Sequence, residues 1–162
     1  MIEIDSTARI SALADIEASA RGTNIVIGAR AVVDSFVKIK PAGGVGDLYI
    51  GEECHINAGT VIYTGNGVKI GKGVLIAANC TLAPTNHEFA RADIPIVEQK
   101  FKASRGGILI EDDVWIGANS VILDGAVIRK GAVVGAGSLV RAELSAYVVY
   151  AGNPLREIGR RR

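Results

Sequence analysis

One histidine lies where a proton-transferring side chain is to be expected. His87 is one of two histidines, and it falls in residues 84–109, a segment that interrupts the regular pattern on either side of it. Loops carried on a rigid scaffold often hold functional side chains, and imidazole accepts and releases protons near neutral pH. His87 is therefore the candidate general base, with Glu88 or Asp93 as the candidate partner that orients its second ring nitrogen. The alternative is a loop histidine that only forms a hydrogen bond.

The regular pattern around this segment is a repeat of six residues. In the C-terminal part of the chain an aliphatic residue recurs at every sixth position, and a second inward position follows four residues after each. The aliphatic set is Ile110, Ile116, Ile122, Ile128, Val134 and Val140, and the second set is Val114, Ser120, Ala126, Ala132, Ser138 and Leu144. A period of six matches neither a helix nor a strand. It is typical of parallel β-helices, in which each hexad forms one short strand and a turn.

The repeat continues towards the N-terminus in groups of three hexads separated by short insertions. These groups begin at Ile4, Ile27, Ile50 and Ile70. A single coil buries little surface, so many stacked coils are needed for a stable core. The sequence predicts an all-β fold with one domain over residues 1–162: a parallel β-helix of about six coils, a loop excursion at 84–109 and a C-terminal segment at 146–162. In that segment Asn153 and Pro154 predict the N-cap and first turn of a short helix.

Composition and charge limit the classes of protein to consider. The net charge is +1, too balanced for a nucleic-acid-binding surface. The chain lacks a run of about 18 apolar residues that would span a membrane, and its first residues lack the features of a signal peptide. A cytoplasmic protein without nucleic-acid partners is expected. Cys54 and Cys80 fall on small inward positions, which predicts reduced core residues and no catalytic role.

Four local sequences are informative in addition to the repeat. They are Asn86-His87-Glu88-Phe89, the run at 93–99, Val114-Trp115-Ile116-Gly117-Ala118-Asn119 and Ala151-Gly152-Asn153-Pro154. With the hexads, they make most of the chain similar to the hexapeptide-repeat O-acetyltransferases, especially those acting on galactosides, maltose or surface polysaccharides. This resemblance implies a left-handed β-helix, an exception to the right-handed crossover preference, in a homotrimer with active sites between subunits. It also implies acetyl-CoA as the acyl donor and no required metal.

The same resemblance implies roles for particular residues. His87 matches the family's catalytic histidine, and Asn57 matches an asparagine that contacts the acceptor sugar, although a coil corner explains an asparagine equally well. The residues that match the acetyl-CoA groove are Trp115, Ala118, Ala136, Arg141 and Arg156. Of these, Arg156 is expected to reach a CoA phosphate, because a guanidinium suits phosphate geometry. For Trp115 and the two alanines, the alternative is a purely structural position.

The expected function is transfer of an acetyl group from acetyl-CoA to a hydroxyl of a sugar or related small acceptor, in polysaccharide biosynthesis. Two alternatives stay open: N-acetylation of an amino-sugar nucleotide, and a non-catalytic structural β-helix. A zinc enzyme of the carbonic anhydrase type, which shares this fold, needs three histidines where the chain has two. The galactoside and maltose enzymes also carry an N-terminal helical segment that helps to build the acceptor pocket. Here the hexads begin at Ile4, so the acceptor's identity is left open.

Overall fold

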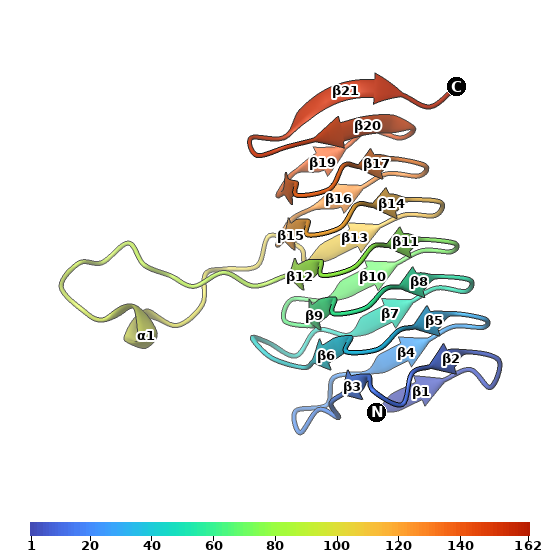
Figure 1. Cartoon of the computed structure of the whole chain (residues 1–162). Helices are drawn as coiled ribbons and strands as arrows, with labels where there is room; N and C mark the ends of the chain where they lie inside the picture. Colours follow the sequence, from blue (N-terminus) through green and yellow to red (C-terminus); the bar gives the residue numbers. More distant parts are fainter.

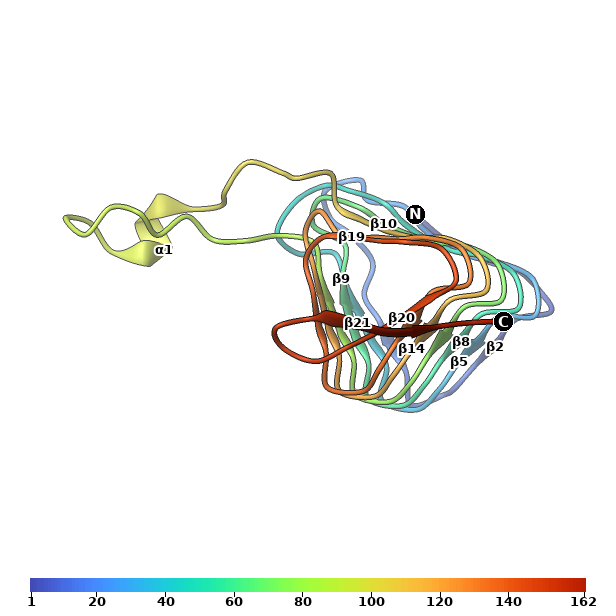
Figure 2. The same ribbon diagram turned by 90° about the horizontal axis from the view of Figure 1, so that it is seen from above.

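The computed structural model describes residues 1–162 as a triangular prism wound from three sheets (Figure 1, Figure 2). The chain passes along sheet A, sheet B and sheet C in turn, and each circuit forms one coil. Within each sheet, every coil pairs in parallel with the coil before it and the coil after it. The prediction of an all-β parallel helix of about six coils is confirmed, and two further strands begin a seventh coil.

The strands are short and belong to the sheets as follows. Sheet A contains β1 (Ile2–Ile4), β4 (Ile25–Ile27), β7 (Leu48–Ile50), β10 (Val68–Ile70), β13 (Ile108–Ile110), β16 (Val127–Ile128) and β19 (Glu143–Leu144). Sheet B contains β2 (Arg9–Ile10), β5 (Val32–Val33), β8 (His55–Ile56), β11 (Leu75–Ile76), β14 (Trp115–Ile116), β17 (Val133–Val134), β20 (Val148–Ala151) and β21 (Arg156–Arg160). Sheet C contains β3 (Asp15–Ile16), β6 (Lys38–Lys40), β9 (Val61–Tyr63), β12 (Thr81–Ala83), β15 (Val121–Leu123) and β18 (Leu139–Val140).

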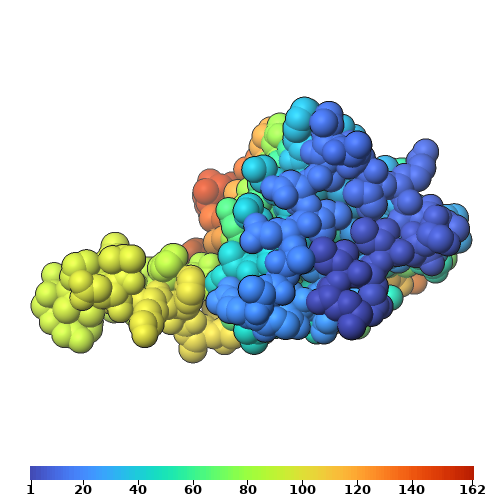
Figure 3. All heavy atoms as spheres, turned by 90° about the horizontal axis from the view of Figure 1, so that it is seen from below, coloured from blue at the N-terminus to red at the C-terminus, as the bar shows by residue number.

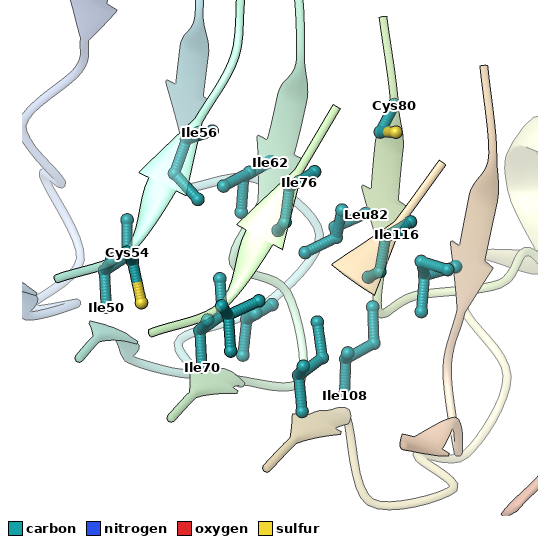
Figure 4. Packing of buried hydrophobic residues seen from close by; sticks show 14 of the residues in the cluster. Ile50, Cys54, Ile56, Ile62, Ile70, Ile76, Cys80, Leu82, Ile108 and Ile116 are labelled. Atoms are coloured by element: carbon teal, nitrogen blue, oxygen red, sulfur yellow. The ribbon is translucent and has the colours of Figure 1, made fainter. Parts of the chain in front are cut away.

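The interior of the prism is a stack of aliphatic side chains held in register. In sheet A, Ile70 pairs with Ile50 on one side and with Ile110 on the other, so each large side chain lies against its equivalent in the next coil. One core cluster contains 28 buried residues. Figure 4 shows labelled isoleucines from all three sheets pointing into this interior. The inward positions predicted from the period of six are thereby confirmed for the central coils.

The two cysteines belong to this interior, as predicted. Cys54 and Cys80 are free thiols and are almost completely buried. Burial raises the pKa of both thiols, because a thiolate would lose its hydration there. Their sulfurs lie 2.9 Å from the Gly71 carbonyl oxygen and 3.3 Å from the Gly117 carbonyl oxygen, respectively. Both cysteines therefore act as packing residues and stay protonated at neutral pH.

The C-terminal segment differs from the prediction. It contains no helix: β20 is followed by a turn with a cis Asn153–Pro154 peptide, and β21 then pairs antiparallel with β20. The predicted short helix is wrong because the last parallel strand of sheet B has an open edge. Strand β21 supplies hydrogen-bonding partners along that edge, which a helix at the same place would leave unpaired.

Leu144 also lies in a different place from the one its spacing suggests. It pairs with Ile128 in sheet A and is only 2% exposed. It is therefore the first large inward residue of the seventh coil, and not the second inward position of the sixth. The chain between Val140 and Leu144 is two residues shorter than a hexad, so the regular register ends there.

The excursion leaves the prism after β12, at the corner between sheets C and A, and returns at β13. It covers residues 84–107, because Ile108 and Leu109 already belong to β13. Figure 1 and Figure 3 show this segment standing away from the prism on a narrow neck, with the short helix α1 (Ile96–Gln99) near its tip. No helix has the length and apolar character needed to cross a membrane.

Candidate active site

The two arms of the excursion are tied together at its neck. His87 and Phe101 form an antiparallel bridge. On one side of the bridge, the Glu88 N–H donates to the Lys100 carbonyl oxygen at 3.0 Å. On the other side, the Lys102 N–H donates to the Asn86 carbonyl oxygen at 2.8 Å. The backbone of the candidate base is therefore held by a short ladder at the edge of the prism, although the rest of the loop projects outwards.

The imidazole of His87 is exposed and contacts the ring of Phe101. The ring centroids lie 4.7 Å apart and the ring planes are tilted by 37°. Neither carboxylate proposed from the sequence orients the imidazole. Glu88 accepts the N–H groups of Phe89 and Ala90, which lower its pKa, and Asp93 is paired with Arg91, which lowers the pKa of Asp93. Both imidazole nitrogens are without a hydrogen-bond partner in this chain.

A hollow of about 250 Å³ opens beside this imidazole. Its walls are formed by Ala42, Gly43, Tyr63, Ala83, Thr85, His87 and Phe101. They come from strands β9 and β12 of sheet C, from the turn after β6 and from the neck of the loop. None of these side chains carries a fixed charge. The hollow can therefore receive an uncharged group, with the aromatic rings available to the apolar face of that group.

Tyr63 and Phe101 are site residues that the sequence argument missed. Tyr63 is an outward residue of sheet C, and Phe101 lies fourteen positions after His87 on the returning arm of the loop. The available signal for Tyr63 was an outward aromatic at the end of a strand, directly before the insertion that interrupts the repeat at residues 65–67. For Phe101 no periodic signal exists, because the loop ladder alone brings it to His87.

Several candidate donor residues lie on another corner of the prism, between sheets B and C. Ala118 and Ala136 are stacked there in successive coils, and the Gly137 N–H donates to the Ala118 carbonyl oxygen at 2.8 Å. Gly117 has no room for a Cβ, which would collide with the backbone of Ala136. Asn57 lies on the same corner in an earlier coil, and its amide donates to the Ile76 carbonyl oxygen at 2.8 Å. The small corner residues thus allow tight stacking, and Asn57 has a structural contact.

The remaining candidates are divided among the neighbouring surfaces. Trp115 is 53% exposed on the outer face of sheet B. Arg156 begins β21 with an exposed side chain, after the turn that is stacked above the corner of Ala136. Arg141 is exposed after β18, at the corner between sheets C and A. Within one chain, the structure thus places His87 and Arg141 on one corner and the other candidates on a different corner or on the adjoining face.

Comparison with known proteins assigns the repeats to a family. Residues 107–142 match the family described as bacterial transferase hexapeptide (six repeats), and residues 48–84 match the hexapeptide repeat of succinyl-transferase. Galactoside O-acetyltransferase of Escherichia coli is 35% identical over 112 residues, which cover 69% of this chain and 53% of that protein. The chain belongs to the hexapeptide-repeat transferases. It spans about half the length of that curated relative.

Solved structures extend the similarity of this hexapeptide-repeat protein to almost the whole chain. A variant of AntD, an N-acyltransferase from Bacillus cereus in complex with dTDP-4-amino-4,6-dideoxyglucose and coenzyme A, has a TM-score of 0.83 and 28% identity, covering 99% of this chain and 84% of that one. A hexapeptide-repeat acetyltransferase of Vibrio cholerae complexed with acetyl coenzyme A has a TM-score of 0.64 and 26% identity, covering 83% and 69%. The fold is the left-handed β-helix of this family.

Proposed function

We propose that this protein transfers an acetyl group from acetyl-CoA to a hydroxyl of an uncharged sugar or similar small acceptor, with His87 as the general base. The observation that carries the proposal is the position of the His87 imidazole, which forms one wall of an uncharged hollow and has both nitrogens free. The similarity to galactoside O-acetyltransferase supports the reaction class. The aromatic walls support an acceptor with an apolar C–H face, as a sugar ring has.

In the proposed reaction the acceptor binds in the hollow with one hydroxyl at an imidazole nitrogen. That nitrogen takes the hydroxyl proton as the oxygen attacks the thioester carbonyl carbon. A tetrahedral intermediate forms and collapses when the carbon–sulfur bond breaks. The leaving CoA sulfur then takes the proton from the imidazolium, so His87 returns to its neutral form. Because the acceptor itself attacks, no acylated side chain is required, consistent with the buried, protonated cysteines.

The acetyl-CoA groove is proposed to follow the corner between sheets B and C. Ala118 and Ala136 leave room for the pantetheine arm beside the backbone, and Trp115 flanks it from the face of sheet B. Arg156 has no acidic partner, and its only hydrogen bond is to the Leu155 carbonyl oxygen, so its guanidinium is free for phosphate. Arg141 is placed beside the same donor in the trimer that we propose. Asn57 is retained as an acceptor-binding candidate whose oxygen can accept a hydrogen bond, since its amide nitrogen is the group used within the chain.

An N-acyltransferase acting on an amino-sugar nucleotide is the second candidate. The similarity to AntD over 99% of this chain favours it. The chemistry at His87 is the same for an amine, because the attacking nitrogen must also lose a proton. Matched pairs of hydroxyl and amino sugars, free and as nucleotides, distinguish the two candidates by their relative kcat/KM.

Release of CoA thiol in the presence of acetyl-CoA and a panel of sugars tests the proposed function. We expect acceptor-dependent thiol release with at least one uncharged sugar. The side chains that line the hollow carry no fixed charge, so a neutral sugar ring can enter without an electrostatic penalty. Sugar acids of the same size serve as the matched comparison and are expected to react more slowly. If the protein neither binds CoA nor releases thiol with any acceptor, the non-catalytic structural β-helix is favoured instead.

A homotrimer is proposed as the functional unit. His87 and the corner that carries Ala136 are on different edges of one prism, so a neighbouring subunit is needed to bring a base and a donor groove together. The outer face of sheet B exposes Leu75 by 45% and Trp115 by 53%, an apolar surface suited to an interface. Light scattering at micromolar concentration should give about three times the chain mass of 16.9 kDa. A monomeric mass under these conditions contradicts the proposal, and Leu75→Lys is expected to weaken the assembly.

A further inference from the structure

We propose that Phe101 is the residue that positions the His87 imidazole. This inference rests on the proposed role of His87 as the base. A catalytic histidine commonly donates its second ring nitrogen to a carboxylate or carbonyl, which fixes the orientation of the ring. In this chain neither Glu88 nor Asp93 is hydrogen-bonded to the imidazole: Oε1 of Glu88 accepts two backbone N–H groups, and Asp93 is paired with Arg91. The ring of Phe101 is the group in contact with the imidazole.

The ladder at the neck explains why the two rings meet. The Glu88 N–H bonds to Lys100 and the Lys102 N–H bonds to Asn86, so the hydrogen bonds flank the His87–Phe101 pair and are not exchanged within it. In antiparallel ladders, pairs of this kind have the closer Cα atoms and the closer side chains. The centroid distance of 4.7 Å is within the range of favourable aromatic pairs, and the ring planes are tilted by 37°. The backbone therefore aligns the rings, and Phe101 closes off one side of the imidazole.

The size of the effect follows from the orientations that Phe101 excludes. A histidine side chain has three staggered χ1 positions and a roughly two-fold χ2, which gives about six orientations. Without Phe101 the exposed imidazole is free to sample most of them, and one presents a nitrogen to the hollow. Phe101→Ala should therefore lower kcat by at most about sixfold, less than loss of the base itself. The KM for acetyl-CoA should not change, because the proposed donor groove lies on another corner.

The experiment compares three variants of the full-length chain. Phe101→Ala removes the ring, Phe101→Tyr restores an aromatic ring at the same place, and Phe89→Ala is the matched control. Phe89 is in the same loop and 61% exposed, but its ring faces the Lys102 ammonium at 4.0 Å and not His87. We expect kcat to fall by about four- to sixfold only in Phe101→Ala and to return to within about twofold of the wild type in Phe101→Tyr.

Imidazole proton NMR provides a readout that does not depend on turnover. The chain has two histidines, so His87→Ala assigns the signals directly. Loss of the Phe101 ring current should move the His87 signals in Phe101→Ala, while the His55 signals and the Phe89→Ala spectrum stay as in the wild type. This combination supports the proposal.

Two results would overturn it. One is a kcat of Phe101→Ala within twofold of the wild type while His87→Ala is inactive, which leaves the proposed function intact and removes the positioning role. The other is an equal loss in Phe89→Ala and Phe101→Ala, which indicates a general effect of the loop. If His87→Ala keeps its activity, the proposed function fails, and the NMR comparison still reports whether Phe101 holds the imidazole.

Discussion

Replacing His87 by alanine is expected to lower kcat by about 10²–10⁴-fold, the contribution typical of one general base. The affinity for acetyl-CoA should be nearly unchanged, because the residues proposed to bind it, apart from Arg141, are on the corner and face that carry Ala136 and Trp115. Stability should also be nearly unchanged, since His87 is exposed. Steady-state kinetics, CoA binding by calorimetry and thermal unfolding of the same preparation test the three parts of this result.

His55→Ala is the matched control for this experiment. His55 is the other histidine of the chain and lies exposed on β8 of sheet B, away from the hollow. Its replacement should leave kcat unchanged in a protein that keeps its trimeric mass in light scattering, which is measured in parallel because His55 pairs with Leu75 on the face proposed as the interface. Retention by His87→Ala of more than about a tenth of the wild-type kcat would rule out the role, because such a base contributes less than about 1.4 kcal/mol.

The fold was largely predictable because every coil has the same local packing requirement. Each coil must place one large aliphatic residue inward per strand, and the same residue must stack on its neighbours, as Ile70 does between Ile50 and Ile110. A period that is neither helical nor strand-like thus identifies the β-helix from the chain alone. The first coil shows the limit of this argument. Ile4 is on the pattern but 43% exposed, because only one neighbouring coil covers it.

The C-terminal segment was mispredicted for a physical reason. Asn153 and Pro154 have the local preferences of a helix start, and local preference is the only information that a sequence offers there. In the folded chain the open edge of β20 competes for the same backbone, and the antiparallel pairing of Ala151 with Arg156 and Val148 with Arg160 prevails. Tertiary hydrogen bonding therefore overrides the capping signal at the end of the prism.

The candidate site was predictable in part. His87 could be located because it lies in the one long break in the period, and Cys54 and Cys80 could be assigned to the core by their register. The partner of His87 could not be chosen. A sequence shows Glu88 and Asp93 as nearby carboxylates, but it does not show that they bond to neighbouring N–H groups and to Arg91 and not to the imidazole. The candidates for acetyl-CoA binding could also be chosen by residue type. Their distance from His87 could not be predicted, because it depends on which corner of the prism each hexad forms.

Replacing Ile122 by aspartate is expected to destabilise the protein by more than about 4 kcal/mol, a large part of the roughly 5–15 kcal/mol by which native proteins are stable. Ile122 is fully buried in β15, between Leu82 of the preceding coil and Val140 of the following one. Aspartate there would remove apolar contacts with both neighbours and bury a carboxyl group among aliphatic side chains without a partner. Because each coil stacks on the next, the disturbance interrupts the core in the middle of its C-terminal half. Urea unfolding of the two proteins measures the difference.

Two comparison variants separate loss of register from loss of volume. Ile122→Val deletes one buried methyl group and is expected to cost about 0.5–1.5 kcal/mol. Arg129→Ala changes an outward side chain that is 40% exposed and pairs with Glu111 at 2.8 Å and with Glu143 at 2.7 Å. Since solvent screens such surface pairs, its effect should be small compared with that of the buried aspartate. Equal unfolding midpoints for Ile122→Asp and Arg129→Ala would contradict the inward register of β15. They would also contradict the stacking of coils that positions Ala118 at its corner and the loop that contains His87.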